Sequence, residues 1–279
     1  MKVDPRALAG IDIKIARASK HLDALHGEMV AWDQRRPWRL SHEVHDNGRK
    51  HLFRLRYEEE IPVEWAVVLG EIIHNLRSAL DQSVYWLGVD WTGKPVPGSS
   101  FPVYVRKANF AERSKRSKAW SSTSGMHKIR GIGPGPHAFV EALQPYPQRC
   151  GRRRECLALR LLHDFWNQDK HRLVHLWGLR VTDDKMELPV KIADDCVLGI
   201  DRRIRHEGAI VMRLICDPPH PEVQMSGELT AFLSIQAGKQ AGGATMSLLE
   251  MLRITARVVR NLTDAVGHQA DPVSLPRAT

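Results

Sequence analysis

The chain has 279 residues, of which 43% are hydrophobic and 26% are charged, a composition typical of a globular protein. This composition excludes a disordered, a collagen-like or a disulfide-stapled chain. Lysine and arginine exceed aspartate and glutamate by nine, which gives a formal net charge of +9 and an isoelectric point of about 9.6.

The cysteines and the apolar segments indicate the cellular compartment. The chain has four cysteines, none of them in a CxxC pair: Cys150, Cys156, Cys196 and Cys216. Such scattered thiols are typical of reduced cysteines in a cytosolic protein. The first ten residues contain no apolar core of a signal peptide, and the apolar stretch 63–73 is interrupted by Glu64 and Glu71. We therefore expect a soluble cytoplasmic protein that makes no membrane contact.

The first half of the chain is expected to form two long helices and a hairpin. Apolar residues recur at helical spacing over 7–30 and again over 62–87, where Pro62 begins the helix. Between them, Asp46-Asn47-Gly48 separates the segments 38–44 and 51–57, and Asn-Gly is a strong hairpin signal. Residues 88–148 are rich in glycine, proline and serine and are predicted to be a loop-rich excursion with short helices at 110–117 and 137–143.

The second half is expected to contain two further helices, at 153–176 and 245–266, around a small β insertion at 178–236. Three partly alternating segments predict strands in that insertion, at 190–192, 209–215 and 228–235. The sequence thus predicts an α+β fold, in which a single domain, 1–279, combines a bundle of about four long helices with a β-hairpin at 38–57 and a small antiparallel β insertion.

The helix 62–87 carries an ionisable stripe beside its apolar face. Its expected buried face consists of Trp65, Leu69, Ile72, Ile73, Leu76, Leu80, Val84 and Leu87. His74, Arg77 and Asp81 follow one edge of that face at positions i, i+3 and i+7. Such a stripe is either a local ladder of ion pairs or part of a functional site.

A carboxylate in the helix 153–176 favours a site. Asp169 falls in the middle of an apolar face that includes Phe165, Trp166 and Leu173. A desolvated carboxylate needs a partner, and the nearest cationic stripe is that of His74 and Arg77. We therefore expect Asp169 to contact Arg77 across the bundle, with His74 nearby. The pair could equally fix the register of the bundle, because buried ion pairs often have that role.

The same residues carry a resemblance. The strings from Gly70 to Asp81 (GEIIHNLRSALD) and from Asn167 to Arg172 (NQDKHR), with Phe101-Pro102-Val103 and Gln144-Pro145-Tyr146 between them, resemble a widespread family of uncharacterised bacterial proteins. The resemblance covers residues 60–180 and implies no activity. A helical bundle with Arg, His and Asp on facing helices is also remotely similar to the HEPN superfamily, many of whose members are metal-independent ribonucleases.

The chain departs from the HEPN pattern, in which four to six residues separate the arginine and the histidine. Only two residues separate Arg160 from His163 and Arg172 from His175, and the glycines and prolines of 131–136 are expected to preclude a helix between Arg130 and His137. The candidate site residues come instead from the stripe of the helix 62–87 and from the string 167–172. They are His74, Arg77, Asp81, Asp169, Lys170, His171 and Arg172.

The basic segments predict a polyanionic partner. Basic residues are concentrated in 113–118, in 149–154, in 202–205 and along one stripe of the last helix at Arg253, Arg257 and Arg260. Each is most simply a solvated face, but together with the high isoelectric point they favour nucleic acid, RNA more than DNA. The sequence is compatible with a homodimer, and no motif for a cofactor or a metal is expected to be used.

Two hypotheses follow. In the first, the chain is a nucleic-acid-binding bundle, a HEPN-like ribonuclease acting in defence or stress, in which His74 is the acid–base, Arg77 stabilises phosphorane charge, and Asp169 and Arg172 position them. In the second, it is a non-catalytic binding or scaffold protein whose Arg/His/Asp cluster is structural. A cluster that opens to a cleft lined by basic residues favours the first hypothesis, and a sealed cluster favours the second.

Overall fold

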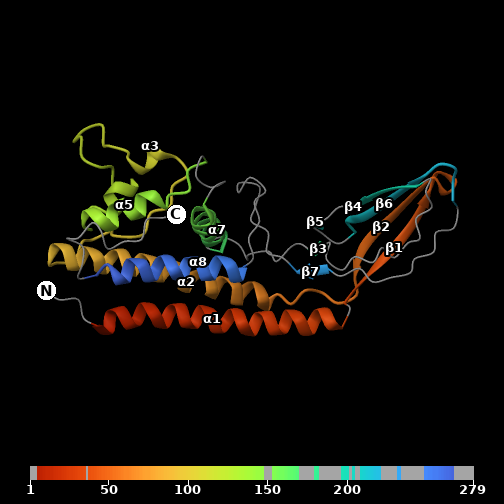
Figure 1. Cartoon of the computed structure of the whole chain (residues 1–279), viewed down its shortest axis with the longest axis horizontal. Helices are drawn as coiled ribbons and strands as arrows, with labels where there is room; N and C mark the ends of the chain where they lie inside the picture. Colours follow the sequence, from red (N-terminus) through yellow and green to blue (C-terminus); the bar gives the residue numbers. More distant parts are fainter. Residues whose placement is uncertain are drawn as a thin grey trace. The chain divides into compact units, whose positions relative to one another are not determined.

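The computed structural model describes residues 5–35, 37–147, 153–169, 179–181, 196–200, 203–204, 208–220, 231–233 and 248–266. These residues combine helices with antiparallel sheets, which confirms the α+β class (Figure 1). The chain divides into two compact units. Unit 1 comprises Met1–Asp23, Val67–Val174 and Ala237–Thr279, and unit 2 comprises Ala24–Ala66 and His175–Gln236. The expected loop-rich excursion falls in unit 1, and the hairpin and the β insertion fall in unit 2.

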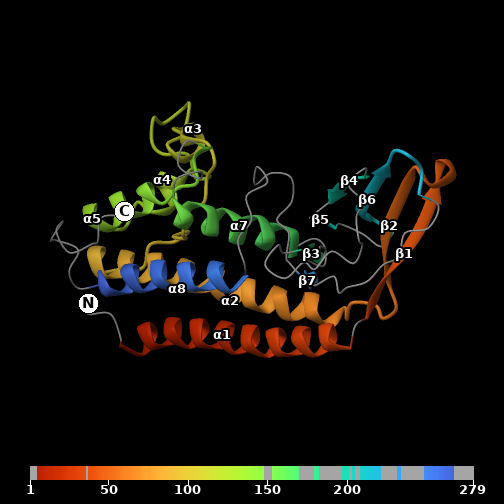
Figure 2. The same cartoon turned by 45° about the vertical axis from the view of Figure 1, so that its right-hand side comes forward.

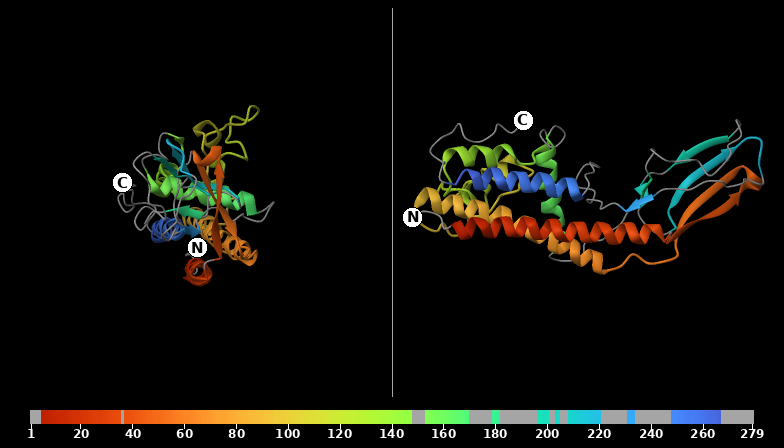
Figure 3. Two further views of the ribbon diagram at one scale, coloured as in Figure 1. Left: turned by 90° about the vertical axis from the view of Figure 1, so that its right-hand side faces the viewer. Right: turned by 60° about the horizontal axis from the view of Figure 1, so that its bottom comes forward.

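The described residues form seven α-helices: α1 (Pro5–Gln34), α2 (Glu64–Thr92), α3 (Lys107–Phe110), α4 (Gly125–Lys128), α5 (Pro134–Ala142), α7 (Arg154–Asp169) and α8 (Leu248–Asp264). The bundle of about four long helices is thus not confirmed in that form, because α3, α4 and α5 add short helices. Within unit 1, α2 and α8 are seen lengthwise in Figure 1 and α7 almost end-on, so α7 crosses them steeply, as Figure 3 also shows. None of the described helices has the length and apolar character that crossing a bilayer requires.

The buried face of α2 is the one that its sequence predicts. All eight residues of that face are at most 3% exposed. Their spacing at three and four residues places them on one side of a 3.6-residue helix, where each removes apolar surface from water. The helix continues to Thr92, five residues beyond the predicted end.

The segment between α2 and α7 packs more closely than its composition predicts. Phe101, Phe110, Ile129 and Val140 are each at most 1% exposed, so the excursion supplies part of the core of unit 1. The predicted helix at 110–117 is replaced by the shorter α3 and a loop, while α5 lies close to the prediction at 137–143. As expected, no helix joins Arg130 to His137, because α4 ends at Lys128 and α5 begins only at Pro134. The prolines do not prevent α5 itself, since a proline in the first turn removes an N–H that has no helical acceptor.

Unit 2 contains two sheets built from β1 (Trp38–His45), β2 (Lys50–Tyr57), β3 (Leu179–Val181), β4 (Cys196–Ile200), β5 (Arg203–Ile204), β6 (Ile210–Cys216) and β7 (Ala231–Leu233). The first sheet has the order β1-β2-β6-β4 and the second β5-β3-β7, with every pairing antiparallel. The predicted hairpin is confirmed, with Asp46, Asn47 and Gly48 at positive φ in its turn.

The predicted strands of the β insertion are found in part. β6 matches 209–215 and β7 lies inside 228–235, whereas the prediction at 190–192 lies outside the described residues. Strands β3, β4 and β5 were not predicted, because two to five residues give too short an alternation to distinguish a strand from a loop. The end of the predicted helix 153–176, beyond Asp169, also lies outside the described residues.

Two of the cysteines are paired. Cys196 and Cys216 lie directly opposite each other on β4 and β6 and form a disulfide. The expectation of reduced thiols is therefore wrong for these two residues, because antiparallel pairing brings together cysteines that are far apart in sequence. Cys156 is free and buried, and Cys150 lies outside the described residues. Since disulfides are rare in cytosolic proteins, this argument for a cytoplasmic location no longer holds, and the location stays a prediction.

The disulfide should stabilise the β4–β6 pair measurably. It closes a loop with a sequence separation of 20, for which the chain-entropy estimate is about 3 kcal/mol. A reducing agent should therefore lower the urea midpoint of the wild type and leave that of Cys196→Ser/Cys216→Ser unchanged. Alkylation that finds four free thiols in protein never exposed to reductant would contradict the disulfide.

Candidate functional site

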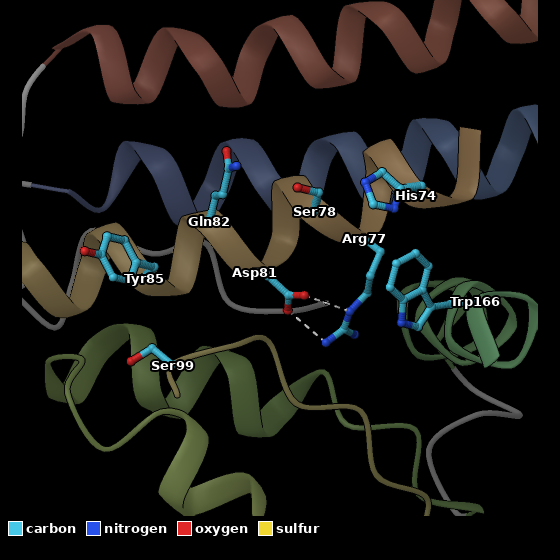
Figure 4. Close-up of a pocket in the computed structure, with 8 residues that line it drawn as sticks. All are labelled: His74, Arg77, Ser78, Asp81, Gln82, Tyr85, Ser99 and Trp166. Atoms are coloured by element: carbon cyan, nitrogen blue, oxygen red, sulfur yellow. Dashed lines mark hydrogen bonds and ion pairs between the residues drawn. The ribbon is translucent and has the colours of Figure 1, made fainter. Parts of the chain in front are cut away.

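A pocket opens on unit 1 beside the ionisable stripe of α2. It has a volume of about 330 Å³ and is lined by His74, Arg77, Ser78, Asp81, Gln82, Tyr85, Ser99 and Trp166. Figure 4 shows that six of these side chains come from α2, while Ser99 comes from the segment after α2 and Trp166 from α7. The helical repeat places the α2 residues on one side of the helix because they recur at intervals of three and four.

Arg77 and Asp81 bind the returning chain at Phe101. The Arg77 guanidinium donates to Asp81 through Nε (3.2 Å to Oδ2) and Nη2 (2.8 Å to Oδ1), and Nη2 also donates to the carbonyl of Phe101. The amide of Phe101 donates to Asp81 Oδ1 at 2.8 Å. We call these three residues the Arg77 clamp. The alternative of a local ion pair along the helix is confirmed, and the clamp holds the fully buried Phe101 against α2.

Gln144 is a second anchor of the segment that contains Phe101. Its side chain is fully buried, and its Nε2 donates to the carbonyl of Pro102 (3.0 Å) and to that of Val140 (2.9 Å), while its Oε1 accepts from the amide of Tyr104 (3.0 Å). Three of the strings that carry the family resemblance are therefore joined by hydrogen bonds: the α2 stripe, Phe101-Pro102-Val103 and the glutamine of Gln144-Pro145-Tyr146. Their spacing has a structural cause.

One nitrogen of the clamp has no partner. The Arg77 side chain is 8% exposed, and its Nη1 is buried without a hydrogen-bond acceptor among the described residues. In Figure 4 the Arg77 side chain lies between Asp81 and Trp166, and Nη1 is the guanidinium nitrogen that the dashed lines to Asp81 do not reach. A buried N–H without an acceptor costs about 1–3 kcal/mol. Arg77, which lines the pocket, thus carries one cationic donor that no described residue satisfies.

His74 also lines the pocket, one turn of α2 before Arg77. Its ring is exposed and contacts the indole of Trp166, with 5.3 Å between the ring centroids and an angle of 41° between the planes. An exposed imidazole is accessible to a ligand that binds in the pocket. Trp166 also fixes the ring position from α7, so a ligand in the pocket would meet an aromatic side chain, a histidine and an arginine.

The expected contact between Asp169 and Arg77 is wrong. No ion pair joins Asp169 to Arg77 or His74; instead its carboxylate lies over Gly70, where an added Cβ would be 2.5 Å from Oδ1. Two features explain the difference: Asp81 supplies the carboxylate from one turn along the same helix, and α7 crosses α2 nearer to Gly70. Asp169 is also only half-buried, so its desolvation does not demand a partner.

The structure brings together three of the seven candidate residues, His74, Arg77 and Asp81, in the pocket. Asp169 lies outside the pocket lining, and Lys170, His171 and Arg172 lie outside the described residues. Sequence reasoning did not select Ser78, Gln82, Tyr85, Ser99 and Trp166. The polar positions 78, 82 and 85 continue the stripe of His74 and Asp81 at helical spacing, and that signal could have found them. Trp166 and Ser99 reach the pocket only through tertiary packing.

The basic segments differ in how far their charges are neutralised. Arg154 forms an ion pair with Glu250, and Arg257 of the α8 stripe forms one with Glu155. Residues 149–152, 202 and 205 lie outside the described residues. The run 113–118 is described in full and is exposed except for the half-buried Ser114.

Comparisons with known proteins add no relative: no family model, no curated protein and no solved structure matches the chain. The resemblance to the bacterial family and to the HEPN superfamily therefore stays a prediction. Among the described residues, no group of three or more His, Cys, Asp or Glu side chains is arranged to hold a metal ion.

The clamp predicts unequal effects of removing Arg77 and Asp169. Arg77→Ala should lower the free energy of unfolding by about 1–3 kcal/mol, because it leaves the Phe101 carbonyl without its side-chain donor and the Asp81 carboxylate, which is 35% exposed, without its ion-pair partner. Asp169→Ala should change it by only about 0.5 kcal/mol, since no ion pair is lost. Urea unfolding of both variants measures the difference, and equal losses would contradict the clamp.

Proposed function

We propose that the pocket binds a phosphate group of nucleic acid, RNA in preference to DNA, and that the chain cleaves RNA without a metal ion. The observation that carries the proposal is the buried Nη1 of Arg77, which no described residue accepts from and which belongs to a residue that lines an open pocket. The pocket is open, as a site requires, and the basic residues of its lining are His74 and Arg77.

A phosphate oxygen suits this donor for two reasons. A hydrogen bond from a guanidinium to an anionic oxygen is charge-assisted and about twice as strong as a neutral one. Asp81 already holds Nε and Nη2 in a fixed plane, so Nη1 is oriented before the ligand arrives. A donor oriented in advance loses little entropy on binding and can stabilise charge that develops on a phosphorane.

His74 supplies the acid–base step. As a base it takes the proton of the ribose 2′-hydroxyl, whose oxygen then bonds to the adjacent phosphorus. The bond from phosphorus to the 5′-oxygen of the next nucleotide breaks, and the departing oxygen takes a proton from water. The resulting hydroxide takes the proton that His74 holds, which restores the base and the water. Because DNA lacks the 2′-hydroxyl, this reaction is restricted to RNA. Trp166 offers a face on which a neighbouring base can stack.

A second candidate, a non-catalytic scaffold, is favoured by the clamp itself. Two of the three Arg77 nitrogens hold the Phe101 segment or the carboxylate beside it, as a purely structural cluster would. The two candidates differ in what they predict for a variant that lacks the His74 imidazole but keeps the Arg77 clamp: only the ribonuclease loses an activity.

The test is cleavage of a single-stranded RNA by the purified full chain in the presence of a metal chelator. The wild type should cleave the RNA, and His74→Ala should lose at least about 100-fold in rate, the usual contribution of a general acid–base. His74 is exposed, so this variant should unfold at the wild-type urea concentration. A DNA strand of the same sequence should stay intact.

Gln144→Leu is the matched control for damage to the fold. It removes the hydrogen bond from Gln144 to the carbonyl of Pro102, which weakens the anchoring of the Phe101 segment, but it removes no group of the pocket. It should therefore lose stability and keep cleavage activity at temperatures where it is folded. An intact RNA with folded wild type, or equal cleavage by His74→Ala, would remove the ribonuclease proposal and favour the scaffold.

A further inference from the structure

Among the described residues of unit 1, the segment 106–118 has the largest excess of positive over negative side chains. Within thirteen residues it contains six cations and one acid, Glu112: the cations are Arg106, Lys107, Arg113, Lys115, Arg116 and Lys118. All six cations are exposed. The segment includes α3 and most of the loop before α4, and Figure 2 shows this loop projecting from the helices of unit 1.

The loop is held closed by backbone hydrogen bonds and a cation–π contact, and none of these bonds pairs one of its cations with a carboxylate. Arg113 and Trp120 form an antiparallel bridge, and the amide of Ser114 donates to the carbonyl of Ala119 at 2.8 Å. The guanidinium of Arg113 lies 3.9 Å from the centre of the Trp120 ring and donates to the Lys118 carbonyl at 2.8 Å. The loop is therefore ordered while Lys115 and Arg116 stay at its tip, free to contact a ligand.

None of the six cations forms an ion pair with another described residue. Arginines elsewhere in the described chain do pair with glutamates: Arg35 with Glu59, Arg39 with Glu58, Arg54 with Glu43, Arg154 with Glu250 and Arg257 with Glu155. Like charges this close repel one another, and only solvent and salt screen them. An ordered loop with that much uncompensated charge is an electrostatic binding surface for a polyanion.

We propose that the basic loop, residues 106–118, binds the phosphate backbone of RNA outside the pocket and so holds the strand whose phosphate enters at Arg77. The inference rests on the nucleic-acid part of the proposed function. The basic loop then supplies most of the affinity for RNA through contacts with phosphates, and these contacts do not depend on the base sequence.

An anionic lipid surface is the competing polyanion, and the composition of the loop disfavours it. Segments that bind membranes combine basic residues with large apolar side chains that enter the bilayer. The ring of Trp120, just after the segment, is already covered by Arg113. Phe110, at the end of α3, is 1% exposed, and Val105, just before the segment, is 39% exposed. Apart from Val105, the loop thus offers charge without an exposed large apolar side chain.

The experiment measures binding of a fluorescent single-stranded RNA at several salt concentrations, in a His74→Ala background that leaves the RNA uncleaved. The loop variant is Lys115→Gln/Arg116→Gln/Lys118→Gln, which keeps Arg113 and the bonds that close the loop. The matched control is Lys14→Gln/Arg17→Gln/Lys20→Gln on α1, because it removes three cations of the same unit that also lack ion pairs. Both variants have the same net charge.

The loop variant should bind RNA more weakly, and the slope of log affinity against log salt should fall by about 2, since each lost contact to a single strand contributes about 0.7. The α1 control should keep the slope of its parent. Equal slopes in both variants would overturn the inference, as would loop-dependent binding to phosphatidylserine vesicles without RNA binding. If RNA binds through the loop but the wild type leaves it intact, the ribonuclease proposal fails and this inference stands.

Discussion

The Arg77 clamp is the interaction on which the arrangement of the site depends. Three hydrogen bonds from one guanidinium and one from a backbone amide return the chain to α2 at Phe101 after it leaves that helix. Because the Arg77 side chain is only 8% exposed, its hydrogen bonds are stronger than they would be in water, and losing it leaves Asp81 and the Phe101 carbonyl without their guanidinium donor. The clamp also leaves Nη1 without an acceptor among the described residues, so one side chain combines a structural role with an unused donor beside the pocket.

The sequence predicted which residues form the cluster better than it predicted their partners. Hydrophobic periodicity located α2, its buried face and the stripe of His74, Arg77 and Asp81, because helical spacing is a local property. The partner of Arg77 was misassigned to Asp169 because the crossing point of two helices depends on tertiary packing. Gly70 sets that point by letting the carboxylate of Asp169 lie over its backbone. Likewise, neither the contribution of Trp166 to the pocket nor the pairing of Cys196 with Cys216 follows from local spacing.

The two basic features of unit 1 have opposite environments and suit different tasks. Arg77 is desolvated, oriented by Asp81 and single, which suits recognition of one phosphate at a defined place. The cations of the basic loop are exposed, unpaired and numerous, which suits attraction of a long polyanion that salt can weaken. An RNA strand is the ligand that would use both, with its backbone on the loop and one phosphate in the pocket. His74 and Trp166 then lie where the ribose and base of that nucleotide would be.

The most direct measurement is a crystal structure of the full chain with tungstate, whose heavy atom marks the position of a phosphate-like oxyanion. The account predicts one anion in the pocket with an oxygen within about 2.7–3.2 Å of Arg77 Nη1, while the bonds from Arg77 to Asp81 and Phe101 stay in place. A pocket that stays empty at concentrations where tungstate occupies the basic loop would contradict the central claim, and so would an anion bound only after the clamp has opened.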